Sequence, residues 1–344
     1  MRKIAVIGTT AWGTTLATLL ATKGMEVWLW ARTEAEAEFL SRERENKQHL
    51  PGIAFPPTLR ITALTREALS GAELVILAVP SQTMRQNLRK LKEHLDPSII
   101  VLSASKGIEV GSTRRMSEVI TEELGQEFEL RIGVLSGPNF SREVAQGLPT
   151  ATVVASKNAD VARRIQEALF TPRFRAYVND DVVGVELGGA LKNVIALAAG
   201  ISDGLGFGAN TKAALITRGL AEMTRLGVAC GARALTFSGL SGLGDLVATC
   251  FSQLSRNRFV GQELGRGRQL SEILTTLKGI AEGVETTRAC LKLAHSLNVE
   301  MPITQQVHQV LFEGLSPREA VPALMERELK HELSGVSGFR QNSQ

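Results

Sequence analysis

The first part of the chain alternates short apolar runs with stretches of helical spacing. Residues 3–7 form an apolar run, residues 8–13 a turn with glycine at both ends, and residues 14–24 a helical pattern that stops at a glycine. A second apolar run follows at 26–30. Strand, glycine turn, helix and strand within about thirty residues predict the βαβ unit of a dinucleotide-binding domain.

Apolar runs of strand length recur as far as about residue 180. Because each is continuous and flanked by helical or turn signals, they predict an α/β, doubly wound parallel sheet of the Rossmann type. The charged segment 34–49 predicts a solvated helix, and 158–168 predicts another helix. The further strands are expected near 58–62, 71–81, 98–109, 131–136, 149–156 and 173–179.

After about residue 180 the strand signals stop and helical spacing takes over. We therefore predict a Rossmann domain over 1–180, an all-α domain over 181–333 and a disordered tail over 334–344. The helices are expected at 181–201, 209–228, 241–250, 256–264, 270–277, 283–297, 302–312 and 316–329.

One helical stretch, Gly188–Ile201, is small and apolar except at its start, where Lys192 and Asn193 stand. Its small residues would let neighbouring backbones come close. One interpretation is a core helix whose lysine extends to water. The other is a lysine held in a partly dry pocket, where it can exchange a proton with a ligand.

Composition narrows the function classes. Of 344 residues, 44% are hydrophobic and 22% charged, and the net charge is only +4. This balance is ordinary for a soluble enzyme and makes nucleic-acid binding a poor expectation. The three cysteines are far apart, without metal-ligand spacing, so we expect no metal site and a reducing, cytoplasmic location. We expect no membrane insertion.

The glycine turn departs from the G-x-G-x-x-G pattern. Gly8 and Gly13 are present, but Thr10 stands at the middle position, where glycine normally lets the backbone approach a pyrophosphate. An acidic residue at the end of the second strand would favour NAD; the sequence instead has Arg32 there. Arg32 is either a solvated loop residue or a partner for the 2′-phosphate of NADP, so NADP is slightly favoured over NAD.

Other candidate site residues follow the later strands. The carboxyl ends of parallel strands face the ligand, so the tip at Val79–Ser81 predicts one wall of the cofactor site. Lys106 ends the fifth strand beside a glycine. After the sixth strand, Gly137 precedes Asn139, which is expected to cap the next helix unless it binds a polar ligand.

Several segments together resemble one family. They are VIGTTAWGTTLA, LWAR, VPS, SKGIE, SGPNFSREVA, GGALKNVIALAAGI, SGLGDLVATC, SRNR and AEGVETT. In this order and spacing the chain resembles the bacterial NAD(P)-dependent sn-glycerol-3-phosphate dehydrogenases over nearly its whole length. The resemblance implies a Rossmann domain, a helical domain like that of 6-phosphogluconate dehydrogenases, and interconversion of glycerol 3-phosphate and dihydroxyacetone phosphate for phospholipid synthesis.

The resemblance also implies residue roles, with Lys192 as the catalytic acid/base. Two residues depart from the family: Ala11 replaces the usual Ser, and Asn139 the usual Thr or Ser. The implied substrate contacts are Lys106, Gly137, Asn139, Lys192, Asn193, Asp245, Thr249, Ser255, Arg256 and Asn257. The implied cofactor contacts are Gly8, Thr10, Ala11, Trp12, Gly13, Arg32, Lys106, Ser141, Arg256, Ile280 and Glu282.

The chemistry of these side chains agrees with ketone reduction. A lysine ammonium can polarise a carbonyl and protonate its oxygen, and the cofactor supplies the hydride, so no metal is needed. Arg256 and Asn257 would form a donor fork for a phosphate. Two alternatives stay open: a hydroxy-acid dehydrogenase of the same architecture, and a non-catalytic nucleotide- or phosphate-binding protein with a degenerate turn. A homodimer is also open.

Overall fold

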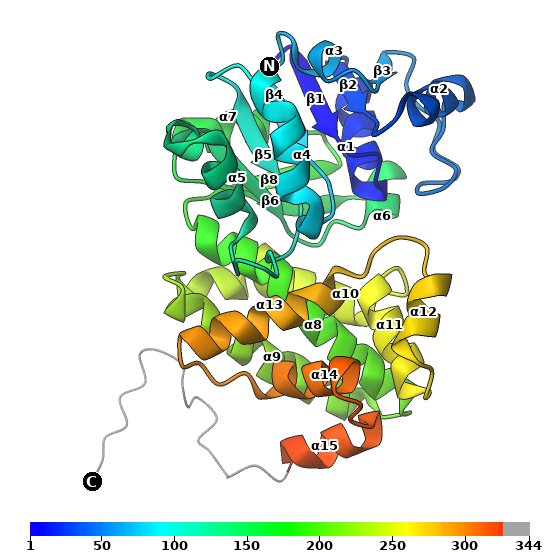
Figure 1. Ribbon diagram of the computed structural model, residues 1–344, viewed down its shortest axis with the longest axis vertical. Coiled ribbons are helices and arrows are strands. Elements are labelled where there is room, and N and C mark those ends of the chain that lie inside the picture. The colour runs from blue at the N-terminus through cyan, green and yellow to red at the C-terminus, as the bar shows by residue number, and fades with distance from the viewer. Residues whose placement is uncertain (326–344) are drawn as a thin grey trace. The chain divides into compact units, whose positions relative to one another are not determined.

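The computed structural model describes residues 1–325 and divides the chain into two compact units (Figure 1). The first comprises Met1–Lys106 and Arg114–Glu186, and the described part of the second comprises Gly107–Thr113 and residues 187–325. The sequence placed the boundary at 180/181, a few residues earlier, and did not assign the short 107–113 segment to the second unit.

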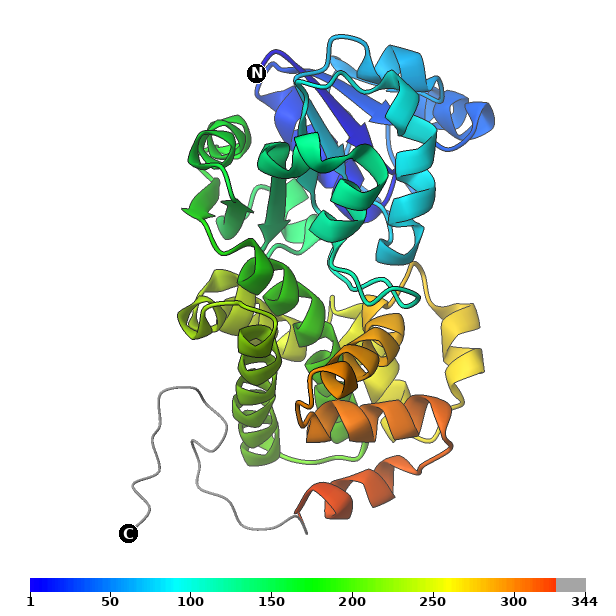
Figure 2. The same ribbon diagram turned by 60° about the vertical axis from the view of Figure 1, so that its left-hand side comes forward.

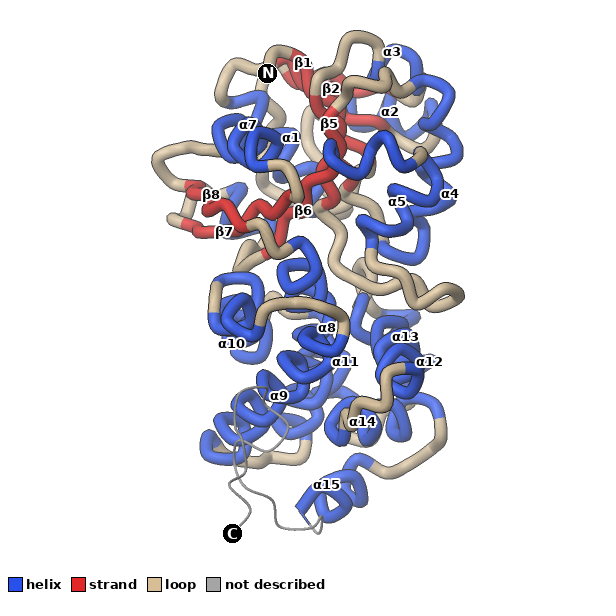
Figure 3. The backbone as a smooth tube through the Cα atoms, turned by 90° about the vertical axis from the view of Figure 1, so that its left-hand side faces the viewer, coloured by secondary structure: helices blue, strands red, loops and turns tan. Residues whose placement is uncertain are grey.

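The first unit contains one eight-stranded sheet in the order β3-β2-β1-β4-β5-β6-β7-β8. Figure 3 shows its strands in red. Their bounds are Lys3–Ile7 (β1), Glu26–Trp30 (β2), Leu59–Thr62 (β3), Leu74–Leu77 (β4), Ile100–Ser103 (β5), Ile132–Ser136 (β6), Thr150–Ser156 (β7) and Phe174–Asn179 (β8).

Helices cover both faces of this sheet, as a doubly wound fold requires. Helical ribbons lie on both sides of the strands (Figure 2). Ile4 and Val6 of β1 belong to one buried cluster with side chains of α1 and α7, and Ala5 and Ile7 belong to another with side chains of α3, α4 and α5. The helices are Ala11–Thr22 (α1), Glu34–Glu43 (α2), Thr65–Leu69 (α3), Met84–Leu91 (α4), Met116–Leu124 (α5), Ser141–Ala145 (α6) and Ala159–Leu169 (α7).

The sheet is parallel from β3 to β6, as predicted, but β7 runs antiparallel to β6. This strand is an exception within the predicted doubly wound sheet. A parallel return needs a long crossover, usually a helix. Here the connection contains only the five-residue helix α6, and the positive-φ Gly147 turns the chain back.

Apart from the non-helical segment Gly107–Thr113, the described part of the second unit consists of helices and the loops that join them. The helices are Val182–Gly204 (α8, beginning in the first unit), Ala209–Ala229 (α9), Asp245–Phe251 (α10), Arg256–Gly265 (α11), Leu270–Thr276 (α12), Glu282–Ser296 (α13), Pro302–Phe312 (α14) and Pro317–Met325 (α15). The predicted helix 316–329 extends beyond residue 325, and the predicted tail 334–344 lies outside the described residues.

Helix α8 is the hydrophobic centre of the helical region. It is long and apolar enough to cross a membrane, but 94% of its most hydrophobic window is buried inside the protein. That burial is typical of a core helix. It places Lys192, which lies on α8, among tightly packed side chains.

Candidate active site

Lys192 is the best-defined candidate for proton transfer. Its side chain is 8% exposed, and its Nζ donates to Asp245 Oδ1 at 2.9 Å and to Thr249 Oγ1 at 2.7 Å. Thr249 Oγ1 in turn donates to Asp245 Oδ1 at 3.2 Å. Lys192 therefore does not extend to water. It is a buried cation held by a carboxylate and a hydroxyl, as the pocket interpretation predicts.

Glycines bring the start of α10 close to α8. A Cβ on Gly188 of α8 would lie 2.7 Å from the carbonyl oxygen of Ser241. A Cβ on Gly242, in the π-helical turn before α10, would lie 2.1 Å from the carbonyl oxygen of Phe237. Neither contact leaves room for a side chain, so the sequence SGLGD positions Asp245 beside Lys192 through backbone packing.

Cys250, next to Thr249, does not add a nucleophile to this site. The residue is fully buried, and burial raises the pKa of its thiol to about 12, although nearby Lys192 acts in the opposite direction. The thiolate is the reactive form of cysteine, so this thiol is inert at neutral pH.

A buried chain of amides joins three helices of the second unit. Asn257 Nδ2, on α11, donates to Asn193 Oδ1, on α8, at 2.8 Å. Asn257 Oδ1 accepts from the backbone N–H of Gly283, at the start of α13, at 2.9 Å. A Cβ on Gly283 would meet the carbonyl oxygen of Asn193 at 2.7 Å. The predicted substrate residues Asn193 and Asn257 thus also fix the helix that carries Lys192.

The SRNR segment begins α11, as predicted. Ser255 is the N-cap, and its side chain accepts from the N–H of Arg258 at 3.2 Å. The backbone of Gly279, which has φ +96°, lies against the guanidinium of Arg256. A Cβ at this position would be only 2.4 Å from Arg256 Nη1. Desolvation by these surroundings lowers the pKa of Arg256, whereas the charge of Glu282, the first residue of α13, raises it.

The turn between β1 and α1 has the shape of a phosphate cradle. Gly8 has φ +108°, and a Cβ on it would lie 2.8 Å from the carbonyl oxygen of Ala78. A Cβ on Gly13 would lie 2.0 Å from the carbonyl oxygen of Gly8. Helix α1 begins at Ala11, so its first backbone N–H groups, including that of Trp12, are available to an anion. These residues fit the pyrophosphate of a dinucleotide.

Thr10 takes a structural role in this turn. Its φ is negative, −62°, a backbone conformation that a β-branched residue adopts readily. Its hydroxyl donates to the carbonyl oxygen of Ala78 at 2.8 Å and accepts from the N–H of Gly13 at 3.1 Å. The only hydroxyl proton is therefore used within the protein, and the side chain acts as the N-cap of α1.

Replacing Thr10 with Gly is expected to lower the free energy of unfolding by about 1 kcal/mol, because the cap and the bond to Ala78 are lost. Affinity for NADH should not rise. Thermal unfolding and fluorescence titration measure the two quantities, with Thr10→Ser as the control that keeps the hydroxyl. A tenfold tighter binding of NADH to the glycine variant would show instead that the threonine obstructs the cofactor.

Lys106 and Asn139 meet in the first unit. Lys106 Nζ donates to Asn139 Oδ1 and to the carbonyl oxygen of Gly137, each at 2.8 Å. Asn139 Nδ2 donates to Thr152 Oγ1 at 3.2 Å. The prediction that Asn139 caps the following helix was wrong: the N-cap of α6 is Phe140, without a side-chain bond, because the amide of Asn139 is taken by Lys106 and Thr152.

The remaining cofactor candidates divide between the units. Ser141 lies beside α1, since its carbonyl oxygen accepts from Thr15 Oγ1 at 3.1 Å. The side chain of Arg32 is 74% exposed, after the end of β2. Ile280 is exposed in the loop before α13 of the second unit.

The sequence analysis missed Glu36, whose carboxylate reaches the glycine turn. The signal that could have found it was its position at a helix start, four residues after Arg32.

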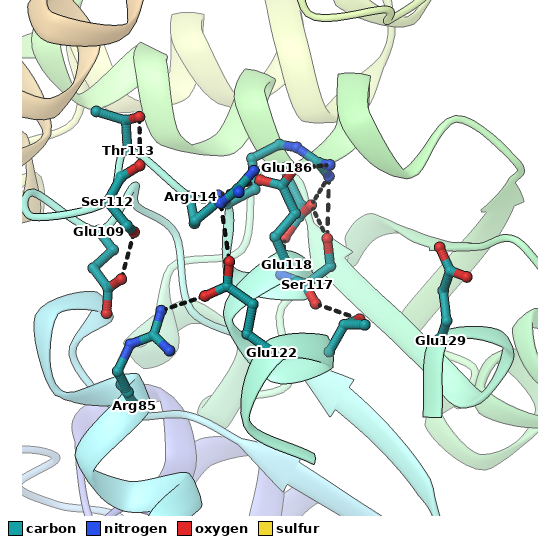
Figure 4. Close-up of polar contacts among 12 residues, drawn as sticks. Arg85, Glu109, Ser112, Thr113, Arg114, Ser117, Glu118, Glu122, Glu129 and Glu186 are labelled. Atoms are coloured by element: carbon teal, nitrogen blue, oxygen red, sulfur yellow. Dashed lines mark hydrogen bonds and ion pairs between the residues drawn. The ribbon is translucent and has the colours of Figure 1, made fainter. Parts of the chain in front are cut away.

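An ion-pair network anchors the beginning of α8 within the first unit (Figure 4). Glu186, six residues before Lys192, accepts from Arg115 Nη1 at 2.6 Å and from both the N–H and the hydroxyl of Ser117. Glu122 of α5 pairs with Arg85 of α4 at 2.7 Å. These contacts tie α8 to the first turn of α5, and α5 to α4.

The N-terminal and C-terminal parts of this chain each resemble the corresponding part of a known protein family. The family described as NAD-dependent glycerol-3-phosphate dehydrogenase N-terminus matches residues 3–162, and its C-terminus counterpart matches residues 181–322. A glycerol-3-phosphate dehydrogenase (NAD(P)+) of Citrifermentans bemidjiense is 55% identical over 96% of this chain and 98% of the relative. One from Dehalococcoides mccartyi is 52% identical over 97% and 94%. A crystal structure of glycerol-3-phosphate dehydrogenase from Coxiella burnetii is 41% identical, with a TM-score of 0.90 over 95% of this chain and 99% of that one.

Proposed function

The chain belongs to the family of NAD-dependent glycerol-3-phosphate dehydrogenases, and from this premise we propose how its residues interconvert sn-glycerol 3-phosphate and dihydroxyacetone phosphate. It is an oxidoreductase of the CH–OH group that uses NAD or NADP. In our proposal the first unit binds the cofactor and the second unit binds the substrate. The observation that carries the proposal is Lys192, a buried ammonium held by Asp245 and Thr249.

Lys192 is the proton donor in ketone reduction. An ammonium group has three N–H donors, and two of them bond Asp245 and Thr249. The third is available to the substrate oxygen. In a site shielded from water a fixed positive charge stabilises the oxygen as negative charge develops on it. In the reverse direction the same nitrogen accepts the proton of the alcohol. The bound nicotinamide cofactor supplies or takes the hydride.

The substrate phosphate is assigned to the start of α11. Helix N-termini attract anions, and an arginine can donate two parallel hydrogen bonds to phosphate oxygens. Arg256 provides this fork, while Ser255 and Asn257 flank it. Because Asn257 is bonded to Asn193, the phosphate-binding end of α11 and the proton donor on α8 keep a fixed separation. The resemblance to the family also assigns substrate contacts to Lys106, Gly137 and Asn139, which belong to the first unit.

Replacing Arg256 with Ala is expected to raise the Michaelis constant for dihydroxyacetone phosphate by about tenfold or more, because a charge-assisted bidentate contact is lost. The constant for a ketone without a phosphate should change little. Steady-state assays with both ketones test this. Arg266→Ala, at the other end of α11, is the matched control, since its half-exposed side chain pairs with Glu263. Equal effects of the Arg256 change on both ketones would make Arg256 a structural residue.

An assay of dihydroxyacetone phosphate reduction, run with NADH and with NADPH, tests the proposed function and separates it from the alternatives. A hydroxy-acid dehydrogenase would instead reduce unphosphorylated oxo acids. A binding protein would take up the cofactor without turnover. The product glycerol 3-phosphate would supply phospholipid synthesis. We further propose a cytoplasmic enzyme without membrane insertion, in agreement with Cys230, Cys250 and Cys290, which form no disulfide within residues 1–325. A homodimer is the assembly to test by light scattering.

A further inference from the structure

A carboxylate from helix α2 reaches the glycine turn. Glu36 Oε1 accepts from Thr9 Oγ1 at 2.5 Å, and Oε2 accepts from the backbone N–H of Arg32 at 3.1 Å. The N–H of Glu36 itself donates to Thr33 Oγ1, the N-cap of α2. Glu36 is only 24% exposed. Both carboxylate oxygens are therefore fixed, and the side chain is not part of the solvated helix face that the sequence predicted.

The two partners of Glu36 lie where the adenosine end of a dinucleotide binds in this fold. Thr9 directly follows Gly8, just after β1, and Arg32 follows the end of β2. These strands are parallel neighbours, with Ile7 opposite Trp30. In dinucleotide-binding folds an acidic residue at the end of the second strand accepts a hydrogen bond from the 2′-hydroxyl of the adenosine ribose. Glu36 brings a carboxylate to the same strand end from the following helix.

We propose that Glu36 determines the cofactor preference of this enzyme and selects NAD over NADP. The inference rests on the proposed function, because it concerns the cofactor of that reaction. The carboxylate accepts a hydrogen bond from the free 2′-hydroxyl of NAD. The 2′-phosphate of NADP adds negative charge at the same place, and two like charges in contact repel.

Arg32 does not cancel this charge. Its Nε is 3.9 Å from Glu36 Oε2, and its side chain is 74% exposed. Exposed ion pairs of this kind contribute little and are screened by salt. In the sequence analysis a 2′-phosphate contact was one of two interpretations of Arg32, because no acidic residue follows directly at the end of β2. The helix α2 supplies that residue from four positions further along the chain.

Binding measurements on the purified full chain test the proposal without depending on turnover. Dissociation constants for NADH and NADPH are measured by fluorescence, and those for 5′-AMP and 2′,5′-ADP by calorimetry. The parent should bind NADH and 5′-AMP more tightly than their 2′-phosphorylated counterparts. Glu36→Gln keeps an oxygen acceptor for Thr9 and removes the charge, so it should shift both ratios toward the phosphorylated ligand by about tenfold, or about 1.4 kcal/mol.

Glu34→Gln is the matched control, because Glu34 is an exposed acid in the same first turn of α2. It should shift the ratios less than about twofold, since exposed charges are screened. Glu36→Ser serves as a second variant, and thermal unfolding checks that both variants fold. The proposal is overturned if the parent prefers NADPH, if neither Glu36 variant moves the ratios, or if Glu34→Gln moves them equally. Failure of dihydroxyacetone phosphate reduction would overturn the proposed function while leaving the binding ratios as an independent result.

Discussion

The Lys192→Ala variant is expected to lose about 10²–10⁴-fold in kcat, the usual cost of removing a general acid. The reason is geometric: Lys192 Nζ is fixed at 2.9 Å from Asp245 and 2.7 Å from Thr249, and alanine removes the ammonium group from this point. Cofactor binding, measured by fluorescence, should persist. Turnover of dihydroxyacetone phosphate near the parent's rate would remove Lys192 from the mechanism.

A stability control is needed because the substitution leaves Asp245 buried without its partner. Breaking a buried ion pair by removing one member typically destabilises a protein by about 3–5 kcal/mol. The double variant Lys192→Ala/Asp245→Asn removes the uncompensated charge and should recover most of that loss in thermal unfolding. Its kcat should stay as low as that of the single variant. Recovery of both quantities together would mean that Lys192 acts only by stabilising the fold.

Much of this site was predictable because its residues follow strong local signals. Lys192 is a single cation in a helix of small apolar residues, and buried lysines are rare without a partner. Gly8 and Gly13 mark the turn between a strand and a helix. Ser255 is an N-cap residue at the start of a helical pattern. In each case the pattern that predicts the residue's position lies within a few residues of it, so the local sequence is enough to make the prediction.

Contacts between distant segments were not predictable in the same way. Glu36 lies in a charged run, and charge alone predicts a solvated helix; only the adjacency of β1 and β2 brings it to Thr9. Asn139 stands where a cap is common, but Lys106, from another strand end, takes its amide oxygen. The hydroxyl of Thr10 is likewise taken by Ala78, on a different strand connection. The partner of a hydrogen-bonding group is set by the segments that the tertiary fold places beside it, and these segments can be distant in the sequence.

The crossing of α8 and α11 is a second place where a single change should have a large effect. A Cβ on Gly261 of α11 would lie 2.0 Å from the carbonyl oxygen of Leu197, and a Cβ on Gly200 of α8 would lie 2.0 Å from that of Arg258. The two backbones are therefore in direct contact. This is the close approach that the small residues of Gly188–Ile201 predicted.

Replacing Gly261 with Ala is expected to destabilise the protein by on the order of 3 kcal/mol, the upper part of the usual range for overpacking, because the methyl group would collide with a backbone carbonyl that cannot rotate away. In an exposed helix the same substitution would stabilise by about 0.5–1 kcal/mol, so the sign of the change is diagnostic. Gly111→Ala, where a Cβ would meet nothing within 4 Å, is the control and should change stability by less than about 0.5 kcal/mol. Denaturant unfolding measures both variants. Helix α11 carries Arg256 and α8 carries Lys192, so a methyl group that forces the helices apart should also raise the Michaelis constant for dihydroxyacetone phosphate. A Gly261→Ala protein as stable and as active as the parent would show that the helices are not in contact at this point.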